Sequence, residues 1–205
     1  MPVLTPDLPL IERLLQTMED DILPLTEKAV HKGNKIFGAA LLRKSDLSTY
    51  LAETNNEMES PLHHGEMHLL KRYFELPTAD RIDPSELIFL STHEPCSMCL
   101  SAITWAGFDN FFYFFSHVDS RDEFAIPHDL KILKEVFDVE PGEYHRSNAF
   151  WQSHGINDWI YRHKQTLDSQ TVTTLADKVR SIHERYAAAS TLYQSSKSGN
   201  SIPLN

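Results

Sequence analysis

The chain has 205 residues, of which 41% are hydrophobic and 23% charged, so it suits one globular domain, alone or with an extension. Its formal net charge of -10 disfavours nucleic acid as a partner, because an acidic surface repels phosphates and no basic cluster is evident. No apolar run could span a bilayer, and the acidic N-terminal segment is unlike a secretory signal. We expect a soluble cytoplasmic protein, with the nucleus as the alternative location.

The first elements are a helix and a hairpin. Residues 9–32 show a helical apolar stripe that breaks near Pro24 and stops at Gly33. Residues 35–43 read as a buried strand, and residues 48–54 pair with it through a short turn. The next elements alternate in type: helices at 64–75 and 96–106, and strands at 87–91 and 110–115. This alternation predicts an α/β sandwich whose sheet is covered on both faces.

The C-terminal third is predicted to be helical, at 129–137, 148–163 and 171–190. In the last helix an apolar stripe predicts packing onto the domain, with a subunit interface as the alternative; its members are Leu175, Val179, Ile182 and Tyr186. The Ser-rich end is expected to be flexible unless something holds it. We therefore divide the chain into a domain at 1–140, a helical extension at 141–190 that packs on it, and a polar tail at 191–205.

Two short segments carry the chemistry. The only cysteines, Cys96 and Cys99, follow Pro95 at the expected start of a helix, and His64 stands at the start of another. Two thiolates three residues apart and one imidazole are ligands that zinc prefers. Three protein ligands leave a fourth position for water, which is typical of a catalytic site.

Glu66 follows the histidine by two residues, close to the expected metal without being needed as a ligand. A carboxylate in that place can take a proton from water and deliver it to a leaving amine. An isolated C-x-x-C pair could be redox-active or structural, but no thioredoxin-like setting surrounds this one.

The pattern His64-Gly65-Glu66, followed by Pro95-Cys96-Ser97-Met98-Cys99, resembles the signature H-x-E…P-C-x-x-C of zinc deaminases. Over roughly residues 10–140 the sequence is similar to the cytidine/deoxycytidylate deaminase superfamily, above all to its cytosine, guanine and tRNA adenosine deaminase branch. The segment EPCSMCLSAITWAGFDNFFYF is like that of guanine and tRNA adenosine deaminases. KIFGAALL resembles the family's first strand, with Ile36 in place of Pro.

This resemblance implies a three-layer α/β/α sandwich around a five-stranded mixed sheet, a Zn²⁺ cofactor and a homodimer. It implies hydrolytic deamination, in which a guanine- or cytosine-like nucleobase or nucleoside loses its exocyclic amine as ammonia. In the family an asparagine after the second strand binds the base; Asn56 stands there, with Asn55 as the alternative. The alternatives are a tRNA adenosine deaminase or its subunit, and, in another class, a non-catalytic partner with a structural zinc.

Other polar and aromatic residues near the motifs have weaker claims. Asp119 and Asp122 follow the strand that leads into substrate loops in relatives, and they are minor substrate-binding candidates. We expect packing or surface roles for His63, His68 and His93, a capping or loop role for Glu94, and helix packing for Trp151 and Trp159. The aromatic region from Trp105 to Phe115 should be mostly core.

Overall fold

The computed structural model describes residues 4–140 and 143–204. Its strands are β1 (Gly38–Arg43), β2 (Thr49–Thr54), β3 (Leu87–His93), β4 (Asn110–Phe115) and β5 (Gln152–Gly155). The helices are α1 (Leu8–Thr17), α2 (Leu23–Val30), α3 (Gly65–Glu75), α4 (Ser97–Trp105), α5 (His117–Asp122), α6 (His128–Phe137), α7 (Ile156–His163) and α8 (Ser169–Ser196).

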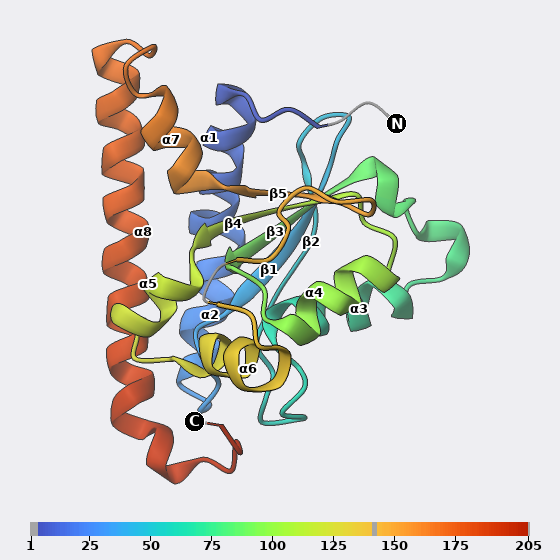
Figure 1. Cartoon of the computed structure of the whole chain (residues 1–205), viewed down its shortest axis with the longest axis vertical. Helices are drawn as coiled ribbons and strands as arrows, with labels where there is room; N and C mark the ends of the chain where they lie inside the picture. The colour runs from blue at the N-terminus through green and yellow to red at the C-terminus, as the bar shows by residue number, and fades with distance from the viewer. Residues whose placement is uncertain (1–3, 141–142, 205) are drawn as a thin grey trace.

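The five strands form one mixed sheet in the order β2-β1-β3-β4-β5 (Figure 1). β1 runs antiparallel to both β2 and β3, whereas β3, β4 and β5 are parallel to one another. The central strands are rich in apolar residues and are almost wholly buried on both faces, as expected where helices cover a sheet on two sides. This confirms the predicted five-stranded mixed sheet.

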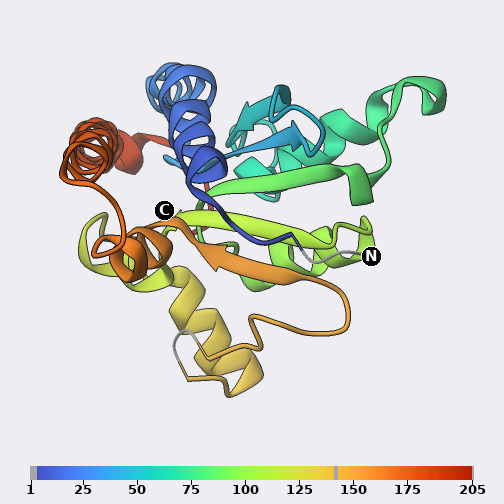
Figure 2. The same ribbon diagram turned by 90° about the horizontal axis from the view of Figure 1, so that it is seen from above.

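Two apolar clusters show how the sheet is covered. One joins Leu14 of α1 and Tyr186 of α8 to Leu90 of β3, and the other joins Leu69 of α3 and Ile103 of α4. Seen from above, α1 and α8 lie on one side of the sheet, with α3 and α4 on the other (Figure 2). The predicted α/β/α layering is therefore confirmed, and so is the packing of the α8 stripe onto the domain.

The prediction of a helix over 148–163 was wrong in its first half. Residues Gln152–Gly155 form β5, and the helix begins at Ile156. The sequence QSHG has no apolar alternation, so no strand was predicted there. β5 is an edge strand that is held in the sheet by backbone pairing with β4. The ring of His154 also stacks on Phe112 of that strand, with 4.9 Å between centroids.

Other differences lie at the ends of elements. The N-terminal helix is interrupted by a π-helical turn at Met18–Ile22, and Pro24 then sits in the first turn of α2, where proline is tolerated. α8 continues to Ser196, and Ile202 in the predicted tail is buried. The aromatic region from Trp105 to Phe115 is mostly core, as expected; Trp105 is the exception and is 91% exposed, because it ends α4 on that helix's outer side.

The predicted boundary between residues 140 and 141 involves residues 141 and 142, which lie outside the described part of the chain. The division into domain, extension and tail stays a prediction, although β5 and α8 both belong to the sheet and core that residues before 140 build. Among the described helices, none has the length and apolar character needed to cross a bilayer.

One close approach fixes α3 on the sheet. A Cβ added to Gly65 would lie 2.6 Å from Cα and 2.8 Å from N of Gly38 in β1. Distances that short require the backbone to move. Gly65 lies between His64 and Glu66, so this contact sets where both flanking side chains emerge.

We predict that Gly65→Ala destabilises the protein by about 1–3 kcal/mol, because overpacking against backbone cannot be relieved by a side-chain rotation. Thermal and urea unfolding measure the loss. Gly199→Ala is the matched control, since nothing lies within 4 Å of a Cβ there. Equal stability of Gly65→Ala and wild type would contradict the contact.

Candidate metal and active site

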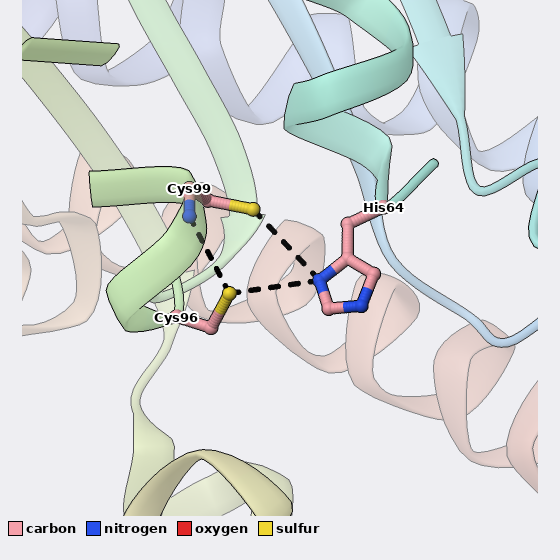
Figure 3. Close-up of side chains that lie close together, drawn as sticks. All are labelled: His64, Cys96 and Cys99. Carbon is pink, nitrogen blue, oxygen red and sulfur yellow. Dashed lines mark hydrogen bonds between the residues drawn. The ribbon is translucent and has the colours of Figure 1, made fainter. Parts of the chain in front are cut away.

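His64, Cys96 and Cys99 converge at one edge of the sheet. His64 is the residue before α3, and Cys96 caps α4, with Sγ accepting the Cys99 N–H at 3.5 Å. Nδ1 of His64 lies 3.6 Å from Sγ of Cys96 and 3.8 Å from Sγ of Cys99. Figure 3 shows the imidazole turned toward both sulfurs. The three predicted ligand residues are thus brought together.

The spacing of these donors fits a tetrahedral zinc ion. With Zn–S near 2.3 Å and Zn–N near 2.0 Å, the N···S edges of a tetrahedron are about 3.5 Å long, close to the two distances found here. The three ligand atoms lie within 4.8 Å of one another, and no other such group of His, Cys, Asp or Glu exists among the described residues. A set of three leaves one coordination position without a protein ligand.

The two thiols and the imidazole influence one another's pKa. Hydrogen bonds from Cys99 and His64 hold the pKa of the Cys96 thiol well below its usual value, and burial raises that of Cys99. Burial opposes a proton on His64, but the hydrogen bond to Cys96 and the nearby negative charges raise its pKa to about 9. The same negative surroundings that favour a proton on His64 also favour a metal cation, which takes the place of that proton when it binds.

Glu66 lies immediately beside the cysteines and is buried. Its Oε2 is 3.4 Å from Sγ of Cys99, and its Oε1 accepts a hydrogen bond from Oγ of Ser91 at 2.8 Å. Burial raises the pKa of this carboxyl group, with the charge of Cys96 adding to the effect. Oγ of Ser91 also lies 2.5 Å from the carbonyl of His93, so its one proton has two acceptors.

A cavity of about 340 Å³ opens next to the candidate ligands. Its walls are mostly apolar, as is usual for small-molecule sites. They come from the ligand loops, from the start of α6 and from the C-terminal segment, and they include His64, Cys96, Met98, Ile126, His128, Asp129, Ile132, Ile202, Pro203 and Leu204. Lys35 and Glu57 complete the wall as a buried ion pair.

The two asparagines follow β2 but differ in surroundings. Asn55 is buried and donates through Nδ2 to Glu57 at 2.8 Å, while its Oδ1 has no hydrogen-bond partner among the described residues. Asn56 is half-buried and donates to Glu59 at 2.5 Å. Neither is among the residues that line the cavity.

The structure does not bring the predicted acidic candidates to the cavity. Asp119 accepts from Ser116 at 2.8 Å in the capping box of α5, and Asp122 is exposed and paired with Arg121. The carboxylate that does line the cavity is Asp129, in the first turn of α6, where burial raises its pKa to about 7. No local motif marks Asp129, because tertiary folding alone brings α6 beside the ligand loops.

The remaining residues near the motifs have packing roles, as expected. His68 contacts the carbonyl of Thr54 at 2.9 Å and stacks on His63, and His93 is buried among aromatic rings. Trp151 and Trp159 pack in the apolar clusters.

Glu94 does more than the predicted capping. Its buried carboxylate accepts hydrogen bonds from N of His117 at 3.1 Å and from the Tyr144 hydroxyl at 2.6 Å, and it forms an ion pair with Arg146 at 3.0 Å. These contacts tie the loop before Cys96 to α5 and to the segment before β5.

Comparison with solved structures gives matches to deaminases at low identity. A guanine deaminase from Bacillus subtilis is 23% identical, with 77% of this chain and 95% of that chain covered and a TM-score of 0.50. A mutant of a protein designated NE0047, in complex with 8-azaguanine, is 18% identical, with 87% and 85% covered and a TM-score of 0.56. NE0047 with 2,6-diaminopurine is 16% identical, with 91% and 84% covered and a TM-score of 0.51.

These likenesses show the fold, and a comparison with curated proteins found no match. Residues 14–115 match the model of the cytidine and deoxycytidylate deaminase zinc-binding region, a span that contains His64, Glu66, Cys96 and Cys99. The sheet topology, the three converging donors and this match agree, and the chain belongs to the cytidine/deoxycytidylate deaminase superfamily of zinc-binding proteins.

Proposed function

We propose that the protein is a zinc-dependent hydrolytic deaminase that replaces the exocyclic amine of a small, planar nucleobase or nucleoside with a carbonyl and releases ammonia. The observation that carries the proposal is a set of three zinc donors, open to a cavity, with a buried carboxylate that is close by but outside the set. A structural zinc ion is normally coordinated by four protein ligands, and a nearby carboxylate that is not a ligand has no role in such a site.

His64, Cys96 and Cys99 hold the metal. When bound, zinc acts as a Lewis acid and makes water a better nucleophile near neutral pH. Glu66 takes one proton from the attacking water and delivers it to the ring nitrogen, then takes the second proton from the hydroxyl group now on the carbon and delivers it to the departing amine, which leaves as ammonia. Ser91 fixes Oε1 of Glu66, so the carboxylate keeps one orientation while it moves the proton.

Glu66→Gln tests this role. We expect it to bind zinc as wild type does and to lose at least about 10²–10⁴-fold in kcat, because an amide cannot accept and return the proton. Ammonia release and zinc content are measured on the same preparation. Full activity in Glu66→Gln would refute the mechanism, and Glu75→Gln, on the exposed end of α3, is the control.

The cavity supports a small substrate. Its volume suits a base or nucleoside, and the net charge of -10 disfavours a nucleic-acid strand. Asp129 provides a carboxylate that can accept hydrogen bonds from the ring N–H and amino groups of a guanine- or cytosine-like base. Which asparagine binds the base stays a prediction. Oδ1 of Asn55 has no hydrogen-bond partner among the described residues, and this favours Asn55 over Asn56.

We predict that Asp129→Asn raises KM for the preferred base about tenfold or more, since a neutral amide presents one acceptor where the carboxylate presents two. The preferred base comes from an ammonia-release screen of bases, nucleosides and nucleotides that begins with guanine, because solved proteins of this fold hold purine analogues. Asp122→Asn is the matched control on an exposed carboxylate. An unchanged KM in Asp129→Asn would remove Asp129 from the substrate site.

The proposed enzyme is a homodimer, as the family resemblance implies, and its cytoplasmic location stays a prediction. Support comes from an apolar surface on the outer sides of α3 and α4, where Trp105 is 91%, Leu62 59% and Phe74 49% exposed. Large exposed apolar surfaces of this kind mark interaction sites. Leu62 also lines the substrate cavity, so a second copy seated here would steady one cavity wall.

Trp105→Glu is expected to shift the protein from dimer to monomer in sedimentation equilibrium, because a buried charge opposes association. Phe150→Glu, a 67% exposed aromatic outside this surface, should leave the dimer intact. A monomeric wild type, or a dimeric Trp105→Glu, would contradict this assignment.

A further inference from the structure

A buried ion pair lies on the far side of the His64 ring from the cysteines. Nζ of Lys35 is 2.8 Å from Oε1 of Glu57, and their side chains are only 5% and 1% exposed. Burying such a pair is often no more favourable than packing apolar residues there, so its stability alone does not explain it. The pair also lines the cavity, within reach of the candidate metal ligands.

The two oxygens of Glu57 are held from different directions. Oε2 accepts from Nδ2 of Asn55 at 2.8 Å and from the main-chain N–H of Lys35 at 3.3 Å. Oε1 faces Nε2 of His64 at 3.8 Å, in addition to its contact with Lys35. The carboxylate is therefore fixed in place, and one oxygen is directed at the imidazole.

The His64 ring has two distinct sides. Nδ1 faces the two sulfurs, and Nε2 faces Glu57. A metal-binding histidine ordinarily donates its second N–H to a carboxylate or carbonyl, which fixes the ring and makes the ligating nitrogen more basic. The gap of 3.8 Å is roughly 0.9 Å longer than an ordinary N–H···O bond, a distance that a small ring rotation can close.

We propose that Glu57, held by Lys35 and Asn55, is the positioning residue that orients His64 as a zinc ligand, an inference that rests on the proposed role of His64. Lys35 supplies the opposite charge that pairs with this buried carboxylate beside the cavity. Glu57 touches neither substrate nor metal in this assignment; it acts through the imidazole.

The test separates this role from that of an ion pair that only holds the chain together. Glu57→Gln leaves the Lys35 charge buried and unpaired. It would therefore lower zinc affinity whether the ion pair is only structural or Glu57 orients His64. The double variant Lys35→Met/Glu57→Gln removes both charges at once, which avoids an unpaired buried charge. In Glu57→Gln the amide oxygen is held by the N–H groups of Asn55 and Lys35, so its NH2 group, which cannot accept a hydrogen bond, faces Nε2 of His64. If the pair is only structural, the double variant therefore regains wild-type zinc affinity; if the Glu57→Gln change removes the group that orients His64, it does not.

The control is a second lysine–carboxylate pair away from the cavity, Lys44 with Asp109 at 2.8 Å, neutralised as Lys44→Met/Asp109→Asn. Glu57→Asp is a further variant, because it keeps the charge for Lys35 but draws the carboxylate back from Nε2. Circular dichroism and thermal unfolding establish that each variant is folded. If the double variant fails to fold, Glu57→Asp decides the question.

The probe is Zn²⁺ alone, in competition with a chromophoric chelator at one fixed pH. We expect zinc Kd to rise about 10–100-fold in Glu57→Gln, in Glu57→Asp and in the double variant, with no change in Lys44→Met/Asp109→Asn. In ¹⁵N NMR spectra of the zinc-loaded protein, the Nε2–H signal of His64 should be protected from exchange in wild type and exposed in the three Glu57 variants.

Wild-type zinc affinity in a folded double variant or in folded Glu57→Asp would overturn the proposal, as would an unchanged Nε2–H signal. Failure of the underlying function gives a different result: either wild type would not bind zinc, or His64→Ala would bind it as tightly as wild type.

Discussion

The contact between Gly65 and Gly38 is the constraint on which the site depends. Two backbones meet there without space for a Cβ, so α3 starts directly against β1. The residue before that contact contributes the imidazole, and the residue after it contributes the buried carboxylate. Because β1 is hydrogen-bonded to β3, whose end leads into the loop of Cys96, the sheet holds both halves of the site at a fixed separation.

Near the site the protein buries several charged side chains, and each of them contacts a polar or charged partner. Glu66 is held by Ser91, Glu57 by Lys35, and Glu94 by Arg146 together with Tyr144. Buried carboxylates are stable only when they are paired and hydrogen-bonded. These partners come from distant segments of the chain, so the acidic groups also connect the layers of the fold near the metal site.

The sequence was informative wherever the signal was local. The convergence of His64, Cys96 and Cys99 and the position of Glu66 beside them could be predicted from residue identity and spacing. The layers could be predicted from alternating apolar elements. β5 could not, since an edge strand as polar as QSHG is held by backbone pairing. The exposure of Trp105, in a region that is otherwise core, could not be predicted, because an aromatic residue at a helix end gives no sign of which side faces solvent. Asp129 and Ile202 join the cavity only through tertiary folding.

The position of the cavity walls in the sequence bears on how proteins of this family can change their substrates during evolution. The family match ends at residue 115, whereas Ile126, Asp129, Ile132 and the segment 202–204 all lie beyond it. On the proposed function, part of the substrate pocket is thus encoded outside the stretch that carries the metal donors, while Lys35, Glu57 and Leu62 of its wall lie within that stretch. Mutation can reshape the pocket while the metal-binding half stays untouched, and a duplicated copy can gain a new substrate without first losing its chemistry. Two related proteins with the same zinc motif can therefore act on different substrates. The motif alone is not sufficient to assign the substrate of one protein to the other.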